Sequence, residues 1–163
     1  MLIGIVSDTH DHVIQIRRVV RFFKTKPIGA LLHAGDFISP SSVEAFIKLR
    51  VPFYGVYGNE DWERREIEAI AAGKVVAPPR KFELGGRTIL MVHDLKRQVK
   101  DSDLGRYDLI VHGNTHAAAI NTYGRSLVVN PGEGCGTLSG QSTVALVNLV
   151  TMRAEIITLK SDS

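Results

Sequence analysis

The first half of the chain alternates short apolar runs with amphipathic stretches, and this alternation restricts the fold more than any other feature of the sequence. The apolar runs are rich in β-branched residues, as strands are, while the stretches between them repeat apolar residues at helical spacing. Ser39-Pro40 is a typical helix start, because serine can cap a helix and proline suits its first position. Strand–helix repeats of this kind favour a largely parallel sheet. The predicted strands cover residues 2–7, 29–33 and 52–57, and the predicted helices cover about residues 11–25, 39–50 and 61–72.

From residue 75 onward, strands and turns replace this alternation. Gly85-Gly86, between two strand-like segments, is a typical two-residue hairpin turn. One sheet cannot bury so many strands together with the helices. We therefore expect an α/β fold, a four-layer sandwich of two mixed β-sheets flanked by helices, formed by a single domain of residues 1–163. The later strands are predicted at residues 81–84, 87–92, 108–112, 117–122, 126–129, 143–149 and 153–159, with a short helix at residues 96–104.

The composition excludes several classes of protein. The 163 residues are 44% hydrophobic, which is enough for one sizeable core. The single cysteine, Cys135, excludes an intrachain disulfide and fits a reducing compartment. Since we see neither a signal peptide nor an apolar run of membrane-spanning length, we expect a cytoplasmic protein without membrane contact. The net charge of +3 is spread along the chain, so a nucleic-acid partner is not indicated.

Side chains that bind metal ions follow five of the predicted strands. In an α/β sheet the carboxyl ends of the strands lie at one edge, where ligands bind, so we expect these side chains to converge. Carboxylate, amide and imidazole groups together suit manganese, iron, zinc or a similar ion. The residues are Asp8, His10, Asp36, Asn59, His93 and His116.

Glycines stand directly before three positions in these turns, where a tight turn must aim a side chain at a common point. Two ions about 3.5–4 Å apart need a shared anionic bridge, and one aspartate on a central turn can supply it. Asp36 is the candidate bridge. The glycines are Gly35, Gly58 and Gly113, which precede Asp36, Asn59 and Asn114.

Each candidate also has an ordinary structural explanation, because aspartate and asparagine commonly cap helices and shape turns. Capping does not explain histidines at these strand ends, and the full set therefore favours a metal site. Asn114 is left open between a ligand and a turn residue. Asp61 is expected to cap the third helix, and structural roles are expected for the remaining histidines. They are His12, His33 and His112.

Taken in order, these short motifs resemble those of the calcineurin-like metallophosphoesterases, and especially the small YfcE-like phosphodiesterase branch of bacteria and archaea. The resemblance covers nearly the whole chain. The matching segments are Asp8-Thr9-His10, Gly35-Asp36, Gly58-Asn59-Glu60-Asp61, the lone His93, Gly113-Asn114-Thr115-His116 and Asn130-Pro131-Gly132.

The resemblance implies two divalent metal ions, with Mn²⁺ as the first choice and Zn²⁺, Fe²⁺, Ni²⁺ or Co²⁺ as alternatives. It also implies hydrolysis of a small phosphoester, first of all a phosphodiester, by a metal-bridging hydroxide. Asp36, Asn59 and His10 would be the catalytic residues, and a homo-oligomer is left open. One ion would be held by Asp8, His10, Asp36 and His116, and the other by Asp36, Asn59, His93 and Asn114.

The chain departs from the family pattern at three positions. Asn114 stands where the family usually has histidine, and Glu60 stands where larger members carry a histidine proton donor, which leaves the general acid open. Asp94 replaces the usual glycine, and its charge would either bind a cation or repel an anionic substrate. Asn114 and Glu60 favour an alternative function, a non-catalytic protein-binding scaffold that retains the phosphoesterase fold. The other predicted ligands favour an enzyme.

Overall fold

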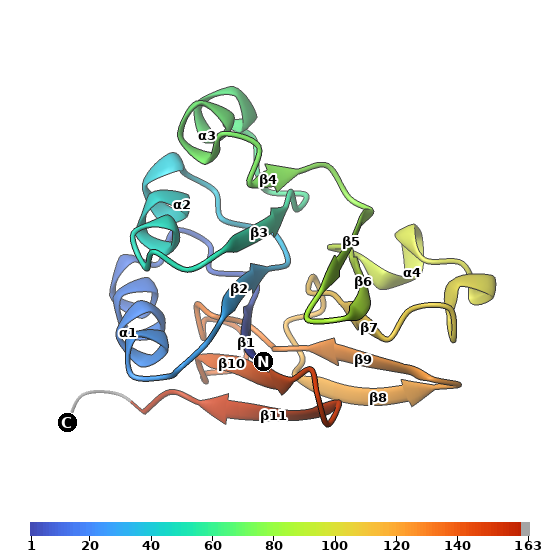
Figure 1. The fold of residues 1–163 in the computed structure, drawn as a ribbon. Coiled ribbons are helices and arrows are strands. Elements are labelled where there is room, and N and C mark those ends of the chain that lie inside the picture. The colour runs from blue at the N-terminus through green and yellow to red at the C-terminus, as the bar shows by residue number, and fades with distance from the viewer. Residues whose placement is uncertain (161–163) are drawn as a thin grey trace.

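The computed structural model, which describes residues 1–160, contains the two mixed β-sheets that the sequence predicts (Figure 1). The first sheet has the strand order β11-β10-β1-β2-β3-β4, with β1 to β4 parallel. The second has the order β5-β6-β7-β9-β8, with β6, β7 and β9 parallel. The strands are β1 (Leu2–Val6), β2 (Ala30–His33), β3 (Phe53–Val56), β4 (Val75–Val76), β5 (Arg80–Leu84), β6 (Arg87–Met91), β7 (Leu109–Val111), β8 (Ala119–Tyr123), β9 (Ser126–Asn130), β10 (Thr143–Asn148) and β11 (Arg153–Thr158).

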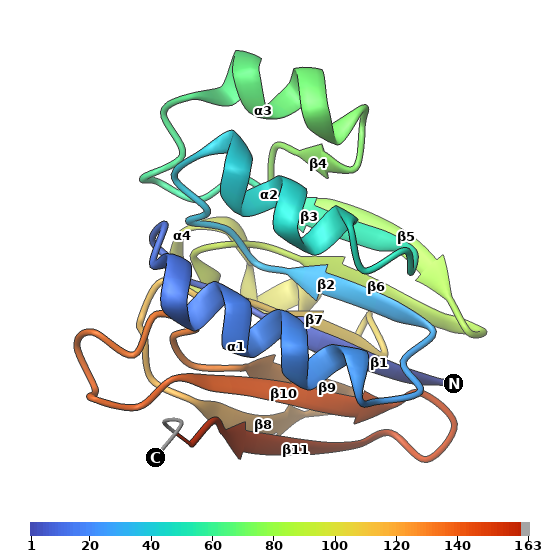
Figure 2. The ribbon, with the colours of Figure 1, turned by 90° about the vertical axis from the view of Figure 1, so that its left-hand side faces the viewer.

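Three helices cover the outer face of the first sheet (Figure 2). They are α1 (Val13–Lys24), α2 (Pro40–Ile47) and α3 (Arg64–Ala71). Their apolar faces pack on the sheet through buried side chains such as Val19, Phe23 and Phe46. The outer face of the second sheet carries the single-turn helix α4 (Leu95–Gln98). No helix in the described part of the chain is both long and apolar enough to cross a membrane.

The main core lies between the two sheets. Ile3 and Ile5 of β1 meet Ile89 and Met91 of β6 there, and all four side chains are fully buried. Successive side chains of a strand point to opposite faces, so Val6 faces the helices instead. Burial on both faces explains why β1 is an unbroken apolar run rather than an alternating one.

Local signals determined how well the helices were predicted. Ser39 caps α2 as expected, its hydroxyl accepting from the N–H of Ser42 at 3.4 Å. The predicted helix at residues 96–104 is wrong in extent. Helix α4 ends at Gln98, because the backbone of Val99 is extended, and only a short 3-10 turn follows at Asp101–Asp103. Strand β4 was not predicted, since two residues are too few to show a period.

Candidate metal centre

All seven predicted site residues lie in loops that follow the carboxyl ends of β1, β2, β3, β6 and β7. Within each sheet these strands are parallel neighbours, so the loops of both sheets meet at one edge of the sandwich. Six of the side chains are linked by short contacts, and Asn114 lines the same cavities. The predicted convergence is therefore present in the structure.

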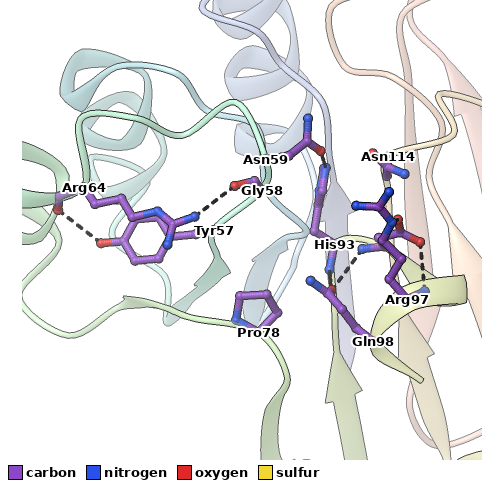
Figure 3. Close-up of a pocket in the computed structure, with 10 residues that line it drawn as sticks. Tyr57, Gly58, Asn59, Arg64, Pro78, His93, Arg97, Gln98 and Asn114 are labelled. Atoms are coloured by element: carbon purple, nitrogen blue, oxygen red, sulfur yellow. Dashed lines mark hydrogen bonds and ion pairs between the residues drawn. The ribbon is translucent and has the colours of Figure 1, made fainter. Parts of the chain in front are cut away.

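Asp36 occupies the centre of the site. Its Oδ2 lies 3.3 Å from His93 Nε2 and 3.6 Å from His10 Nε2, so one carboxylate oxygen faces two imidazole rings. The same His93 nitrogen lies 2.9 Å from Asn59 Oδ1 (Figure 3). Asp36 Oδ1 accepts the N–H of Glu60 at 2.9 Å. One oxygen of Asp36 is thus fixed by the backbone while the other points into the group of ligands.

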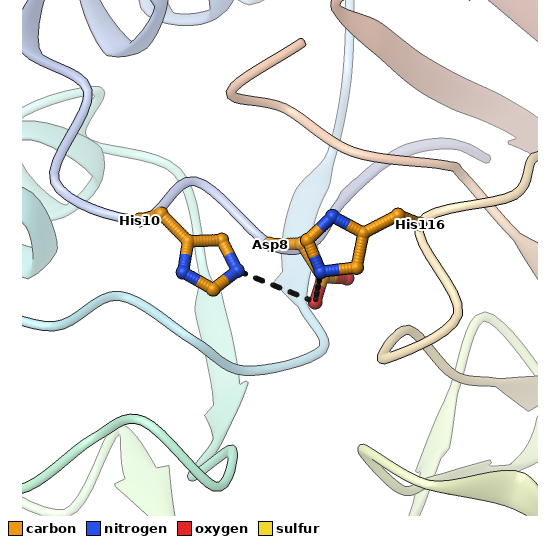
Figure 4. A group of neighbouring side chains, drawn as sticks. All are labelled: Asp8, His10 and His116. Atoms are coloured by element: carbon orange, nitrogen blue, oxygen red, sulfur yellow. Dashed lines mark ion pairs between the residues drawn. The ribbon is translucent and has the colours of Figure 1, made fainter. Parts of the chain in front are cut away.

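Asp8, His10 and His116 form a second group beside the first (Figure 4). Asp8 Oδ1 lies 3.4 Å from His116 Nε2 and 3.9 Å from His10 Nε2. Asp8 Oδ1 and His10 Nε2 are both buried without a hydrogen-bond partner. A buried polar atom without a partner is costly, and a cation held between these atoms would satisfy both. The residues present therefore fit a metal ion.

Electrostatics in the site couple Asp36 to His93. Burial alone would raise the pKa of Asp36, but the hydrogen bond and charge of His93, with the N–H of Glu60, lower it. Burial disfavours the charged form of His93, yet Asp36 and Asp8 outweigh it and raise its pKa to about 9. Burial raises the pKa of Asp8. A proton on His93 thus compensates the buried carboxylates, and a metal ion bound at His93 would displace that proton.

The backbone of the site is in the left-handed region at most of these positions. Such a conformation costs on the order of 1 kcal/mol or more for a residue with a Cβ, and it persists where the surrounding structure enforces it. Clusters of this kind occur at functional sites. The positive φ angles are 52° at Asp8, 42° at His10, 59° at Asp36, 66° at Asn114 and 59° at His116.

The predicted glycines serve mainly to let loops approach the carboxylates. A Cβ on Gly58 would overlap the Asp36 carboxylate, and one on Gly113 would lie 2.5 Å from Asp8 Oδ2. Of Gly35, Gly58 and Gly113, only Gly35 combines such crowding with a positive φ, of 104°. Close packing of neighbouring loops, more than turn conformation, explains these glycines.

Asp61 does not cap α3, which corrects the prediction. The residue that precedes this helix is Glu63, and it makes no side-chain capping hydrogen bond. The buried carboxylate of Asp61 instead ties the loop after β2 to the loop after β3, and so holds the backbone of Asp36 in place. It accepts four backbone N–H groups, from Asp36 at 3.0 Å, Phe37 at 2.7 Å, Ile38 at 2.8 Å and Gly58 at 2.7 Å.

Glu133 is a site residue that the sequence analysis missed. Its Oε2 lies 2.8 Å from His116 Nδ1, which leaves His116 Nε2 facing Asp8. Burial would raise the pKa of Glu133, but hydrogen bonds from His116, Ser139 and Leu138 lower it to about 2. A carboxylate behind a metal-binding histidine orients its ring. The signal was its position directly after Asn130-Pro131-Gly132, at the end of another strand, β9.

The three remaining histidines have structural roles, as predicted. His12 is the N-cap of α1. His33 is fully buried, hydrogen-bonded to Thr9 at 3.1 Å and stacked on Phe37, and burial holds its pKa well below the usual range. Burial likewise lowers the pKa of His112, beside the end of β7.

The departures from the family pattern each have a defined place. Asn114 lines the cavities at the centre, and its backbone N–H donates to Asp8 Oδ2 at 3.1 Å. Glu60 Oε1 accepts from the Asn59 amide at 3.0 Å. Asp94 caps α4, accepting the N–H of Arg97 at 3.2 Å, and pairs with the Arg97 guanidinium at 3.6 Å. The carboxylate of Asp94 thus faces an N–H group and an exposed guanidinium of its own helix.

Comparisons with known proteins agree with this geometry. A family model described as the calcineurin-like phosphoesterase superfamily domain matches residues 1–152. The phosphodiesterase MJ0936 of Methanocaldococcus jannaschii is 30% identical over 154 residues, which are 91% of this chain and 93% of the relative.

Solved structures show the same relationship. The structure of an archaeal phosphodiesterase superposes with a TM-score of 0.88 at 29% identity, covering 98% of this chain and all of that one. The phosphoesterase YfcE of E. coli shares the fold, with a TM-score of 0.70 at 18% identity over 98% of this chain and all of that one. The chain belongs to the calcineurin-like phosphoesterase superfamily.

Proposed function

We propose that the chain is a metal-dependent phosphodiesterase that hydrolyses a small phosphodiester at a centre of two divalent cations. The observation that carries this proposal is the position of Asp36 Oδ2, between His10 Nε2 at 3.6 Å and His93 Nε2 at 3.3 Å. A carboxylate with a potential metal ligand on each side is suited to bridge two metal ions about 3.5–4 Å apart. Family membership and the phosphodiesterases among its relatives support the reaction class.

The ligands divide into two sets that share Asp36. Manganese is our first choice of metal, because mixed oxygen and imidazole donors suit a borderline ion. Glu133, hydrogen-bonded to Nδ1 of His116, orients that ring toward the first ion. The first ion would bind Asp8, His10, Asp36 and His116, and the second would bind Asp36, Asn59, His93 and Asn114.

In the overall reaction, a water oxygen forms a bond to phosphorus and one ester P–O bond breaks, giving a phosphomonoester and an alcohol. Bound divalent cations lower the pKa of water and neutralise the phosphoryl oxygens. Asp36 would hold both cations, and His10 and Asn59, which line the cavity where the phosphoryl group would lie, would orient it. We further propose that residues 1–163 form a single domain acting in the cytoplasm.

Metal content and turnover of bis(4-nitrophenyl) phosphate, measured on the same preparation after chelation and reloading, test the proposal. We expect two ions per chain in the wild type, activity that chelator abolishes, and higher activity with manganese than with magnesium. Asp36→Ala should lose more metal than any other single change. Asp101→Asn, at an exposed aspartate in the 3-10 turn, is the matched control and should retain both metal and activity.

Two outcomes would count against the proposal. Asp36→Ala that still holds two ions would refute the bridging role. Folded, metal-loaded wild type that turns over nothing with manganese, zinc, cobalt or nickel would favour the non-catalytic scaffold.

A further inference from the structure

Two cavities adjoin at the candidate metal centre. The arginine cavity, of about 510 Å³, is lined by Arg64 and Arg97 on the side of His93. The threonine cavity, of about 620 Å³, is lined by Thr115 and Thr137 on the side of His10. Both are large enough for part of a small-molecule ligand. The residues that line both cavities are Asn59 and Asn114.

The two cavities differ in charge. Arg64 and Arg97 line the arginine cavity together with one carboxylate, Asp94, which pairs with Arg97. The threonine cavity is lined by the carboxylates of Asp36 and Glu60, and by neither lysine nor arginine among the described residues. A phosphodiester has two ester arms, one on each side of the phosphoryl group. With the phosphoryl group at the metal centre, each arm would enter one cavity, and only one arm would meet arginines.

Arg64 is held in place without an acidic partner. Its Nε donates to the carbonyl of Asp61 at 3.1 Å and its Nη2 to the carbonyl of Gly58 at 3.4 Å, while its Cζ lies 5.0 Å above the centre of the Tyr57 ring. Among the described residues, no carboxylate forms an ion pair with Arg64. Its positive charge is therefore oriented by neutral groups and remains available to an anion.

Arg97 supplies the second positive charge from the opposite wall (Figure 3). Its side chain is 87% exposed, and its contact with Asp94, at 3.6 Å, joins residues one turn apart in α4. Exposed ion pairs of this kind contribute little, so Arg97 can turn toward a ligand at small cost. Two arginines on facing walls, one fixed and one adjustable, match a tetrahedral oxyanion with three free oxygens.

We propose that the arginine cavity binds a second phosphate group, carried on one ester arm of the substrate. The preferred substrates are then phosphodiesters with an additional terminal phosphate. The other arm lies in the threonine cavity, where hydroxyl groups and the exposed side chain of Leu138 suit an uncharged group, and where the carboxylates of Asp36 and Glu60 disfavour a second anion. This inference rests on the proposed phosphodiesterase function and adds the substrate class to it.

A matched pair of substrates tests the inference: 4-nitrophenyl 2-(phosphonooxy)ethyl phosphate and 4-nitrophenyl 2-methoxyethyl phosphate. In both, a water oxygen bonds to the diester phosphorus and the bond to 4-nitrophenolate breaks. Hydrogen bonds to charged groups are strong, so we expect kcat/KM of the manganese-loaded wild type to be about tenfold or more higher for the phosphorylated substrate. Arg97→Gln and Arg64→Gln should each remove most of this preference, mainly through KM.

Arg65→Gln is the matched control, because Arg65 is exposed on α3 and does not line the cavity. Calorimetry with ethylene glycol bisphosphate, the product of the phosphorylated substrate, measures binding without turnover and should show weaker binding to Arg97→Gln than to Arg65→Gln. Arg97 is exposed, so its variant stays informative even where Arg64→Gln disturbs the loop.

Equal kcat/KM for the two substrates would overturn the inference and leave the phosphodiesterase function standing. A preference that survives both arginine variants would overturn it as well, because the phosphate would then bind elsewhere. Absence of turnover with both substrates in folded, metal-loaded protein would refute the proposed function, and the inference with it.

Discussion

At the scale of single residues, Asn114 combines a backbone role with a place at the metal centre. Its N–H holds Asp8, and its φ of 66° is a conformation that asparagine adopts readily. His116, two residues later, has a φ of 59°, so this loop also accommodates an imidazole on a left-handed backbone. A histidine at position 114 is therefore compatible with the turn.

Asn114→His is expected to tighten the proposed second metal site, because imidazole binds a borderline ion better than an amide oxygen does. Changes to groups that support a metal site alter affinity by about tenfold or more, and we expect at least that here. Manganese titration by calorimetry, with activity followed in parallel, measures the change. Asn121→His, which adds an imidazole on the exposed part of β8, is the control. Equal second-site affinity in wild type and Asn114→His would refute the ligand role of Asn114.

At the scale of helices, strands and loops, the site depends on one carboxylate that joins two loops. Asp61 Oδ1 accepts from Phe37 and Ile38, and Asp61 Oδ2 accepts from Asp36 and Gly58. An asparagine at this position would place an NH₂ group against two of the four N–H donors. The loop that carries Asp36 would then lose part of its attachment to the loop that carries Asn59.

Asp61→Asn is expected to destabilise the fold and weaken metal binding together, since each buried N–H without an acceptor costs about 1–3 kcal/mol. Chemical unfolding and metal content after chelation and reloading measure the two effects. Glu63→Gln is the control, because the carboxylate of Glu63 lies in the same loop and makes no capping hydrogen bond. This variant should change neither the unfolding midpoint nor the metal content. An unchanged unfolding midpoint for Asp61→Asn would contradict the role assigned to this residue.

The same elements show what the sequence could and could not predict. β1 and the hairpin at Gly85-Gly86 were predicted correctly, because an apolar run and a glycine pair are local signals. The roles of Asp61 and Glu133 were not predicted, because their partners lie in other segments of the chain. Nothing in the local sequence distinguishes an aspartate that caps a helix from one that joins two loops. The positions of the strand ends predicted which residues converge. That Asp36 Oδ2 lies close to the rings of both His10 and His93 could be seen only in the structure.

At the scale of the whole molecule, the candidate metal centre brings together residues of the two sheets. Asp8 and Asp36 follow strands of the first sheet, while His93 and His116 follow strands of the second. Each proposed ion therefore has ligands from both sheets. Bound metal should stabilise the folded chain by mass action, by about 2.7 kcal/mol at a free concentration one hundred times the Kd.

The stability of the metal-free protein should fall as the pH rises, while the stabilisation that metal adds should grow. The pKa of His93 is raised from its ordinary value of 6.5 to about 9 in the metal-free fold. A raised pKa gives a contribution to stability that is complete below pH 6.5 and is lost as the pH rises to about 9. In this window the metal-free protein should lose stability. Metal competes with the same proton, so its apparent affinity should rise with pH.

The stabilisation by manganese should therefore increase between pH 6.5 and pH 9, which chemical unfolding of metal-free and loaded protein at a series of pH values can measure. His93→Gln has no proton to lose, so its metal-free stability should change less over this window. It should also bind the second ion weakly. Metal-free wild type whose stability is constant across the window would show that His93 is not held protonated by Asp36. In that case the proposed competition between proton and metal at His93 would be refuted.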